Sequence, residues 1–131
     1  IRETGEIVSE AAVKIRVGEE THHTVAESKG PVGALDHAMR KALETDFPAI
    51  QSVRLKDYKV RILETGRGSD ATVQVLVLSN DGERSWWTTG AGANIIEASW
   101  EALRDSLLYK LQRFARENGG LEADLSPAPP V

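Results

Sequence analysis

Two segments of this chain share one pattern at a separation of 64 residues, and this repeat restricts the possible folds more than any other feature. The first segment is Gly18 to Ala26 and the second is Gly82 to Gly90. The same offset pairs further residues downstream: Ala34 with Ala98, Ala38 with Ala102, and Leu43 with Leu107. An offset that persists from a strand-like stretch into a helix-like stretch predicts a structural repeat, although two ordinary strand-to-helix units could share this much pattern.

Each copy of the repeat predicts two strands followed by a helix. Val13 to Val17 alternates strictly between apolar and polar residues, which is typical of a half-buried strand, and Gly18 ends it. Its counterpart, Val73 to Leu78, is followed by Asn80-Asp81-Gly82, in which Asp-Gly is a strong hairpin signal. We expect second strands at about residues 21–27 and 84–89, each followed by a glycine-rich turn and a helix.

Both expected helices have one apolar face. Pro31 suits the first turn of the first helix, whose apolar residues are Leu35, Ala38, Met39, Ala42 and Leu43. Asn94 and Glu97 form the capping box of the second helix, whose apolar residues are Ile96, Trp100, Leu103, Leu107, Leu111 and Phe114. Such faces must be buried against another element, so we expect both helices to pack on sheets.

A long strand is expected between the two copies, from Val53 to Leu63. Its apolar positions change phase midway, which requires a bulge or bend near Lys56-Asp57. Bulges re-aim side chains and often lie beside sites, so Asp57 and Tyr58 become candidate site residues. An edge irregularity without a functional role explains the phase change equally well.

The triplet Glu-Thr-Gly occurs at residues 3–5 and again at 64–66, where the long strand ends. We therefore expect the leading strand of the first copy to lie upstream of Ile1. The predicted fold is α+β, with two pseudo-symmetric β-β-β-α units, the first lacking its leading strand. One domain is expected over residues 1–118, with units at about 1–46 and 52–118. The proline-rich residues 119–131 are expected to form a flexible tail.

Composition excludes several classes of function. The 16 basic and 20 acidic residues give a net charge of -4, which argues against nucleic-acid binding. The absence of cysteine excludes disulfides and thiolate chemistry. No apolar run is long enough for a membrane span, and no signal peptide is evident, so a cytoplasmic protein is expected.

Residues suited to catalysis or metal binding are sparse. His22 and His23 are adjacent on an expected strand, so their side chains face opposite ways and cannot hold one metal together. His37 has no ligand partner at helical spacing, and no serine has the context of a nucleophile elbow. We therefore expect no catalytic residue, no metal site and no cofactor in this domain.

Trp86 and Trp87 are adjacent on an expected strand, so at most one of them enters the core of its own sheet. The other must cover a neighbouring element or pack at a subunit interface. This indicates an oligomer, unless the second tryptophan is simply exposed.

The glycine-rich turns at residues 28–34 and 89–94 are candidate ligand sites. Exposed amides at a helix N-terminus favour a carboxylate, and glycine allows a ligand to approach the backbone. Neither turn has the spacing of a nucleotide-binding loop, so a small carboxylate fits better than a nucleotide. Packing is the alternative reason for glycine at a helix start.

Four stretches of the chain resemble one known family. They are Gly30 to Asp36, Leu55 to Arg61, Asp81 to Gly90 and, most specifically, Asn94 to Leu103. Together they resemble the C-terminal regulatory (LeuA-type allosteric and dimerisation) domain of the α-isopropylmalate synthase and citramalate synthase family. The resemblance covers roughly residues 10–111.

The resemblance implies an allosteric domain that forms a homodimer and binds the end product of its pathway, leucine or isoleucine. It also implies an upstream catalytic barrel, which uses a divalent metal and acetyl-CoA. The implied effector-binding residues are Gly30, Pro31, Val32, Gly33, Ala34, Asp57, Tyr58, Ile62, Gly90, Ala91, Gly92, Asn94 and Ile95. In this scheme the turn amides take the carboxylate, Asp57 or backbone carbonyls take the ammonium, and Val32, Ile62 and Ile95 take the branched side chain.

Residues 59–63 and 105–111 resemble the citramalate synthase branch more closely. Gly33 stands where many relatives carry a larger or acidic residue, which we expect to loosen the pocket. The alternative function is a structural homodimerisation module that no longer binds an effector. A stand-alone enzyme has no support in the sequence.

Overall fold

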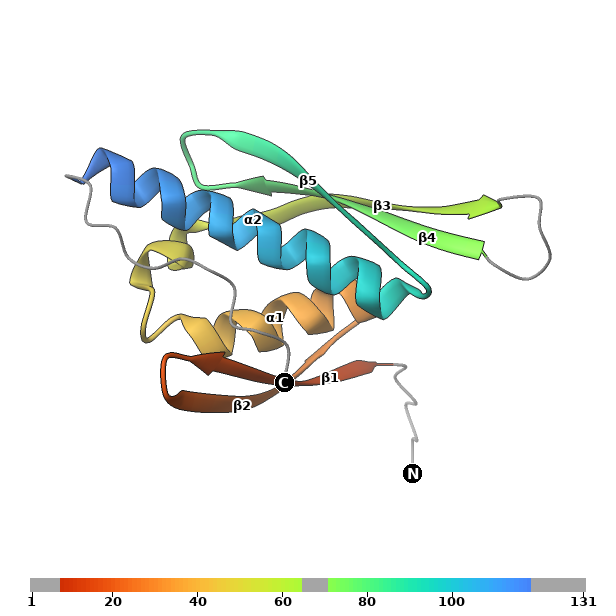
Figure 1. Ribbon diagram of the computed structural model, residues 1–131, viewed down its shortest axis with the longest axis horizontal. Helices are drawn as coiled ribbons and strands as arrows, with labels where there is room; N and C mark the ends of the chain where they lie inside the picture. The colour runs from red at the N-terminus through yellow and green to blue at the C-terminus, as the bar shows by residue number, and fades with distance from the viewer. Residues whose placement is uncertain (1–7, 65–70, 119–131) are drawn as a thin grey trace, which may run out of the picture.

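The computed structural model describes residues 8–64 and 71–118 as two helices that lie between two antiparallel sheets (Figure 1). The elements in chain order are β1 (Ser9–Val17), β2 (Glu20–Ser28), α1 (Pro31–Leu43), the 3₁₀ helix η1 (Pro48–Ser52), β3 (Arg54–Glu64), β4 (Ala71–Asn80), β5 (Ser85–Gly92) and α2 (Ile95–Glu117). One sheet is β1-β2 and the other is β3-β4-β5. The expected α+β class, with helices packed on sheets, is confirmed.

In the first unit, α1 covers one face of the β1–β2 hairpin. The hairpin turns at Gly18, whose φ of 61° is a left-handed conformation that favours glycine. Val13, Leu35 and Met39 are buried between hairpin and helix. Pro31 occupies the first turn of α1, as expected, because a helix start does not use the N–H that proline lacks.

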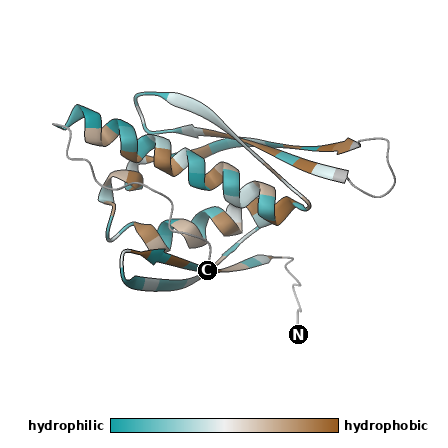
Figure 2. Cartoon of the chain, viewed as in Figure 1, coloured by the Kyte–Doolittle hydropathy of each residue, from teal (hydrophilic) through white to brown (hydrophobic). Residues whose placement is uncertain are grey.

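In the second unit, α2 packs on β4 and β5. Val75 and Val77 of β4 and Trp86 of β5 are buried beneath it. On β3, by contrast, large apolar residues remain exposed. Figure 2 shows the apolar colouring of β3 continuing beyond the start of α2, on the right of the view. Neither described helix has the length and apolarity needed to cross a membrane.

β3 contains the irregularity expected from its change of phase. Its pairing with β4 shifts by one residue between Leu55 and Asp57. Lys56 is therefore the extra residue of a bulge, and Leu55 and Tyr58 lie on the same face of the sheet. The expected bulge near Lys56-Asp57 is confirmed.

The repeat relates the two units element by element. A shift of 64 residues takes β1 onto β4, β2 onto β5, and α1 onto the first half of α2. The hairpin turns also correspond, because Gly82 has a positive φ of 93°. Within residues 8–64 and 71–118, the first unit has two strands and the second has three. The expected tail and most of the Glu-Thr-Gly triplets lie outside the described residues.

The 3₁₀ helix η1, which the sequence did not predict, joins α1 to β3. Asp36 is only 5% exposed and pairs with Arg40 one turn later, at 3.0 Å. The Arg40 guanidinium also donates to the carbonyl oxygens of Ile50 and Val53, at the end of η1. The buried carboxylate is thus paired, and the pair fixes η1 against α1.

Candidate functional site

The α2 turn, residues 89–95, is closed by its own side chains. The Asn94 side chain accepts hydrogen bonds from the N–H groups of Ile96 (2.9 Å) and Glu97 (3.0 Å). The Glu97 carboxylate in turn accepts from the N–H of Ala93 (3.0 Å). The expected capping residues are therefore present, although Glu97 bonds to Ala93 instead of Asn94. The amides at the start of α2 have little left to offer a ligand.

The α1 turn, residues 28–34, is open by comparison. Gly30 precedes the helix, and within the described part of the chain no side chain accepts a hydrogen bond from the first-turn amides of α1. The first turn also carries no acidic residue. Pro31 has no N–H and Val32 is fully buried, so the amide of Gly33 is the one that a ligand carboxylate can meet.

The glycines of the two turns make room for different neighbours. A Cβ atom at Gly33 would lie 2.6 Å from the Oγ of Ser28, so the space above Gly33 is already filled. The expectation that Gly33 loosens a pocket is therefore not supported by the packing. At the corresponding place in the second unit, a Cβ at Gly92 would lie 2.7 Å from the Cβ of Glu97. The repeat offset relates Ser28 to Gly92 and Gly33 to Glu97. Each unit therefore has one glycine and one larger residue in contact, but the glycine comes second in the first unit and first in the second unit.

Gly90 serves the packing of β5 against α2. It is buried, and a Cβ there would lie only 2.0 Å from the carbonyl oxygen of Ala98. Ala91 is exposed on the other face of β5, and Ile95 packs against the core. In this turn, packing explains glycine better than ligand access does.

Tyr58 is the residue of β3 that reaches the α1 turn. A Cβ at Gly30 would lie 3.6 Å from the Tyr58 hydroxyl oxygen, which is ordinary contact distance. Tyr58 is 42% exposed, and Val60 (41%) and Ile62 (68%) continue along the same face of β3. We call Tyr58, Val60 and Ile62 the β3 row.

Not all expected site residues join this group. Asp57 lies on the opposite face of β3 from Tyr58, and its Oδ1 accepts from the N–H of Tyr58 (2.8 Å). Val32 and Ala34 are buried, so their side chains contribute to the core. Ile62 is four residues from Tyr58, about 13 Å along an extended strand. The structure thus brings together Gly30, Pro31, Gly33 and Tyr58.

A shallow hollow of ≈390 Å³ borders the α1 turn on its other side. Pro31 and Leu35 of α1 and Ile96 of α2 line it, together with residues 9–12 of β1. The starts of the two helices therefore lie close to each other. An apolar group held at the α1 turn would find side chains of matching character here.

Trp86 and Trp87 face opposite sides of β5, as expected. Trp86 is 7% exposed and packs on Tyr109, with ring centroids 5.1 Å apart. Trp87 is 47% exposed, and the Lys59 ammonium lies 5.4 Å from its ring centroid. The prediction that only one of the two enters the core is confirmed.

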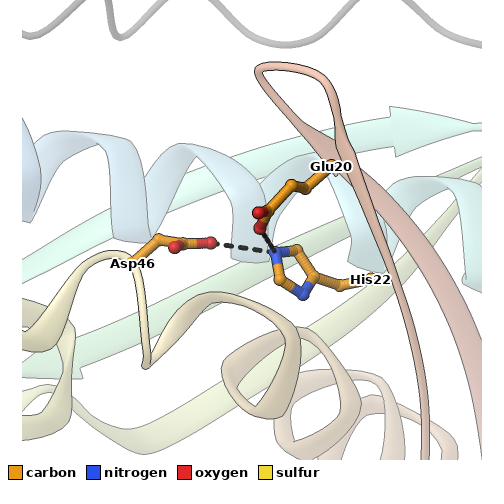
Figure 3. Close-up of side chains that lie close together, drawn as sticks. All are labelled: Glu20, His22 and Asp46. Atoms are coloured by element: carbon orange, nitrogen blue, oxygen red, sulfur yellow. Dashed lines mark hydrogen bonds and ion pairs between the residues drawn. The ribbon is translucent and has the colours of Figure 1, made fainter.

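A separate group of side chains lies where the β1–β2 hairpin meets the end of α1. The side chains of Glu20, His22 and Asp46 point toward one another (Figure 3), with ligand atoms all within 4.8 Å. Residues 20 and 22 share one face of β2, which the sequence alone could indicate. Asp46 comes from the turn after α1, and no local pattern could place it there.

Comparison with known proteins identifies a family and several relatives. The family model described as the LeuA allosteric (dimerisation) domain matches residues 1–111. The (R)-citramalate synthase of Geobacter sulfurreducens is 48% identical over 112 residues, covering 86% of this chain and 21% of the relative. That of Aquifex aeolicus is 49% identical over 109 residues, covering 83% and 21%.

A 2-isopropylmalate synthase of Escherichia coli O127:H6 is 33% identical over 96 residues, covering 73% of this chain and 17% of the relative. The chain therefore spans about a fifth of the length of the curated relatives that it matches. The rest of each relative has no counterpart in the 131 residues.

Proposed function

Because the chain belongs to the family of LeuA allosteric (dimerisation) domains found in citramalate and 2-isopropylmalate synthases, we propose that it binds a branched-chain amino acid and so regulates a synthase of this kind. The observation that carries the proposal is the open α1 turn with the Tyr58 hydroxyl beside it. A free helix N-terminus and a phenol together offer polar contacts suited to a small amino acid.

Different residues around the α1 turn would contact different parts of the ligand. The amide of the partly exposed Gly33 would receive the ligand carboxylate, since no side chain within the described residues accepts a hydrogen bond from it. The Tyr58 hydroxyl can donate or accept one further hydrogen bond. Val60, two residues away on the same face, would contact the branched side chain. Asp57 is left out of this scheme, because it faces the other side of β3.

The relatives favour isoleucine as the effector. Identity to the two (R)-citramalate synthases is 48% and 49%, against 33% to the 2-isopropylmalate synthase. The resemblance found in the sequence associates citramalate synthases with isoleucine and isopropylmalate synthases with leucine. We therefore assign the chain to a citramalate synthase, with a metal-dependent, acetyl-CoA-condensing barrel as its catalytic partner.

The β3 row is the surface that we assign to the second copy of the chain. The family is one of dimerisation domains, and Val60 and Ile62 are exposed on a strand face that α2 leaves uncovered. A partner seated there would also close the ligand off from water at Tyr58. Sensing and dimerisation would then share one surface.

Isothermal titration calorimetry of the purified chain with isoleucine, leucine and valine tests the proposal. We expect isoleucine to bind most tightly, and D-isoleucine, which has the same composition, not to bind. A folded dimer that binds none of the three would contradict effector binding and favour the structural dimerisation module. One missing or shifted methyl group is worth only about 1–3 kcal/mol, so leucine should bind measurably as well.

A further inference from the structure

Glu20, His22 and Asp46 bring three metal-binding atoms together away from the α1 turn (Figure 3). The Nε2 atom of His22 lies 2.9 Å from Oδ2 of Asp46 and 3.8 Å from Oε2 of Glu20. The side chains of His22 and Asp46 are 26% and 33% exposed, so solvent screens this pair only in part. Two elements far apart in sequence thus converge on one nitrogen.

Among the described residues, no lysine or arginine pairs with the carboxylates of this group. An imidazole carries at most one proton on Nε2, so this nitrogen can donate a good hydrogen bond to one carboxylate but not to two. Within residues 8–64 and 71–118, neither Glu20 nor Asp46 has a lysine or arginine nitrogen within 4.0 Å. A cation between the three atoms would satisfy both carboxylates and the nitrogen lone pair.

The second unit closes the corresponding corner with a cation of its own. The repeat offset takes Asp46 onto Lys110, whose ammonium pairs with Asp81 of the β4–β5 hairpin at 2.8 Å. In the first unit an acid stands in place of that lysine, and the hairpin contributes Glu20 and His22. The fold therefore joins helix to hairpin in both units, and within residues 8–64 and 71–118 only the second unit does so with a lysine.

We propose that Glu20, His22 and Asp46 bind one zinc-class divalent transition-metal ion. One imidazole nitrogen and two carboxylate oxygens form a set that Zn²⁺ accepts, with water at the remaining position. Ligand atoms around a tetrahedral zinc ion are roughly 3.3 Å apart, given the usual Zn–N and Zn–O lengths. The two separations from Nε2 of His22, 2.9 and 3.8 Å, bracket this value, and all three ligand atoms lie within 4.8 Å of one another, so side-chain rotation can bring them to a shared ion. Mg²⁺, which prefers six oxygen ligands, fits poorly.

The ion would tie the tip of the β1–β2 hairpin to the end of α1. Helix α1 has 13 residues, so its two ends are about 20 Å apart. The metal site and the α1 turn therefore lie at opposite ends of one helix. The metal proposal does not depend on effector binding and can fail or succeed separately from it.

Calorimetric titration of the metal-free, untagged chain with ZnCl₂ tests the proposal. We expect one equivalent to bind in the micromolar range or tighter, with millimolar MgCl₂ unable to compete. His22→Gln should weaken binding at least tenfold. His23→Gln is the matched control, because this neighbour on β2 faces the other way, and it should leave zinc affinity unchanged. Asp46→Asn, which leaves the hairpin intact, should weaken binding as His22→Gln does.

The visible absorption of a Co²⁺-loaded sample adds a direct readout of coordination. Ligand-field bands that are present in the wild type and His23→Gln, and lost in Asp46→Asn, support the three-residue site. Absence of zinc binding by the folded wild type would overturn the proposal. Equal loss in His22→Gln and His23→Gln would also overturn it, since that is the behaviour of unspecific histidine binding.

Discussion

Thr24 and Thr88, which are 64 residues apart, hold their helices by the same hydrogen bond. The Thr24 hydroxyl donates to the carbonyl oxygen of Ala38 at 2.6 Å, and the Thr88 hydroxyl donates to that of Ala102 at 2.7 Å. The two acceptors are separated by the same offset. The repeat therefore extends from the sequence pattern to an individual bond that joins each strand to the helix after it.

Replacing each threonine by valine should destabilise the fold to a similar extent in both units. We expect Thr24→Val and Thr88→Val each to lower the free energy of unfolding by about 0.5–1.5 kcal/mol. Valine is similar in shape to threonine but lacks the hydroxyl, so each variant loses one side-chain hydrogen bond. Urea unfolding measures this. The double variant should lose the sum, since the sites share no partner, and a loss from only one of the two would argue that the bonds are not equivalent.

Gly90→Ala should be strongly destabilising. The added Cβ would overlap the carbonyl oxygen of Ala98, so β5 and α2 would have to separate, at a cost of about 1–3 kcal/mol or more. Thermal unfolding provides the measurement. Gly30→Ala is the control, because Gly30 has an extended φ of -139° and a nearest neighbour at 3.6 Å. A tolerated Gly90→Ala would mean that the two elements are less closely packed than described.

Asp81→Asn should remove a stabilising contribution that depends on pH. The Lys110 ammonium, helped by the N–H groups of Arg84 and Glu83, holds the pKa of Asp81 well below its ordinary value. A lowered pKa in the folded state stabilises the fold above the unfolded-state pKa of about 3.9, and this stability is lost as pH falls further.

At pH 7 we expect Asp81→Asn to cost about 1–3 kcal/mol in urea unfolding, and we expect the gap from wild type to narrow below about pH 4. Asp105→Asn serves for comparison, because Asp105 is 42% exposed and its pair with Arg104 is 3.4 Å long. Its effect should stay within about 0.5 kcal/mol. A gap for Asp81→Asn that widened in acid would contradict this assignment.

Tyr58→Phe should weaken effector binding without unfolding the domain. Loss of one hydrogen bond of about 1 kcal/mol corresponds to roughly a fivefold increase in Kd for isoleucine. Tyr109→Phe is the control, because Tyr109 packs on Trp86. It should leave the Kd for isoleucine unchanged. If both variants bind isoleucine as the wild type does, the hydroxyl beside Gly30 plays no part in recognition.

Ile62→Asp should shift the dimer toward monomer. Ile62 is 68% exposed, and a charge placed there would have to lose its water if a second chain covers the β3 row. Sedimentation velocity over a concentration series measures the change. Trp87→Ser alters an exposed residue on the other face of the sheet and should leave the dimer intact. A dimer that is lost in Trp87→Ser and kept in Ile62→Asp would place the interface on the face of the sheet that carries Trp87.

The elements of the fold could be predicted because each follows from a local pattern. The alternation in Val13–Val17, the apolar face of α1 and the phase change at Lys56 each depend on residues close together in the chain. The 3₁₀ helix η1 could not be predicted in this way, because it is too short to show a period. It is held instead by Arg40, through carbonyl oxygens ten and thirteen residues away.

The site was predicted less well, because its geometry depends on contacts between distant elements. Both glycine turns looked alike as candidates, and only the packing shows that Gly90 faces a helix backbone while Gly30 faces the Tyr58 hydroxyl. The bulge pointed to both Asp57 and Tyr58, but adjacent strand residues face opposite ways. Asp46 entered no prediction, since its neighbours in space come from another strand.

The caps of the two helices have a consequence for stoichiometry. Asn94 and Glu97 occupy the amide donors at the start of α2, whereas those of α1 are open within the described residues. In the part of the chain that the structure describes, the repeat therefore leaves only one of its two helix starts without a side-chain cap. The amino acid proposed to bind here should therefore saturate the chain at a single equivalent, two for a dimer, because the Asn94 and Glu97 side chains already occupy the corresponding amides in the other half.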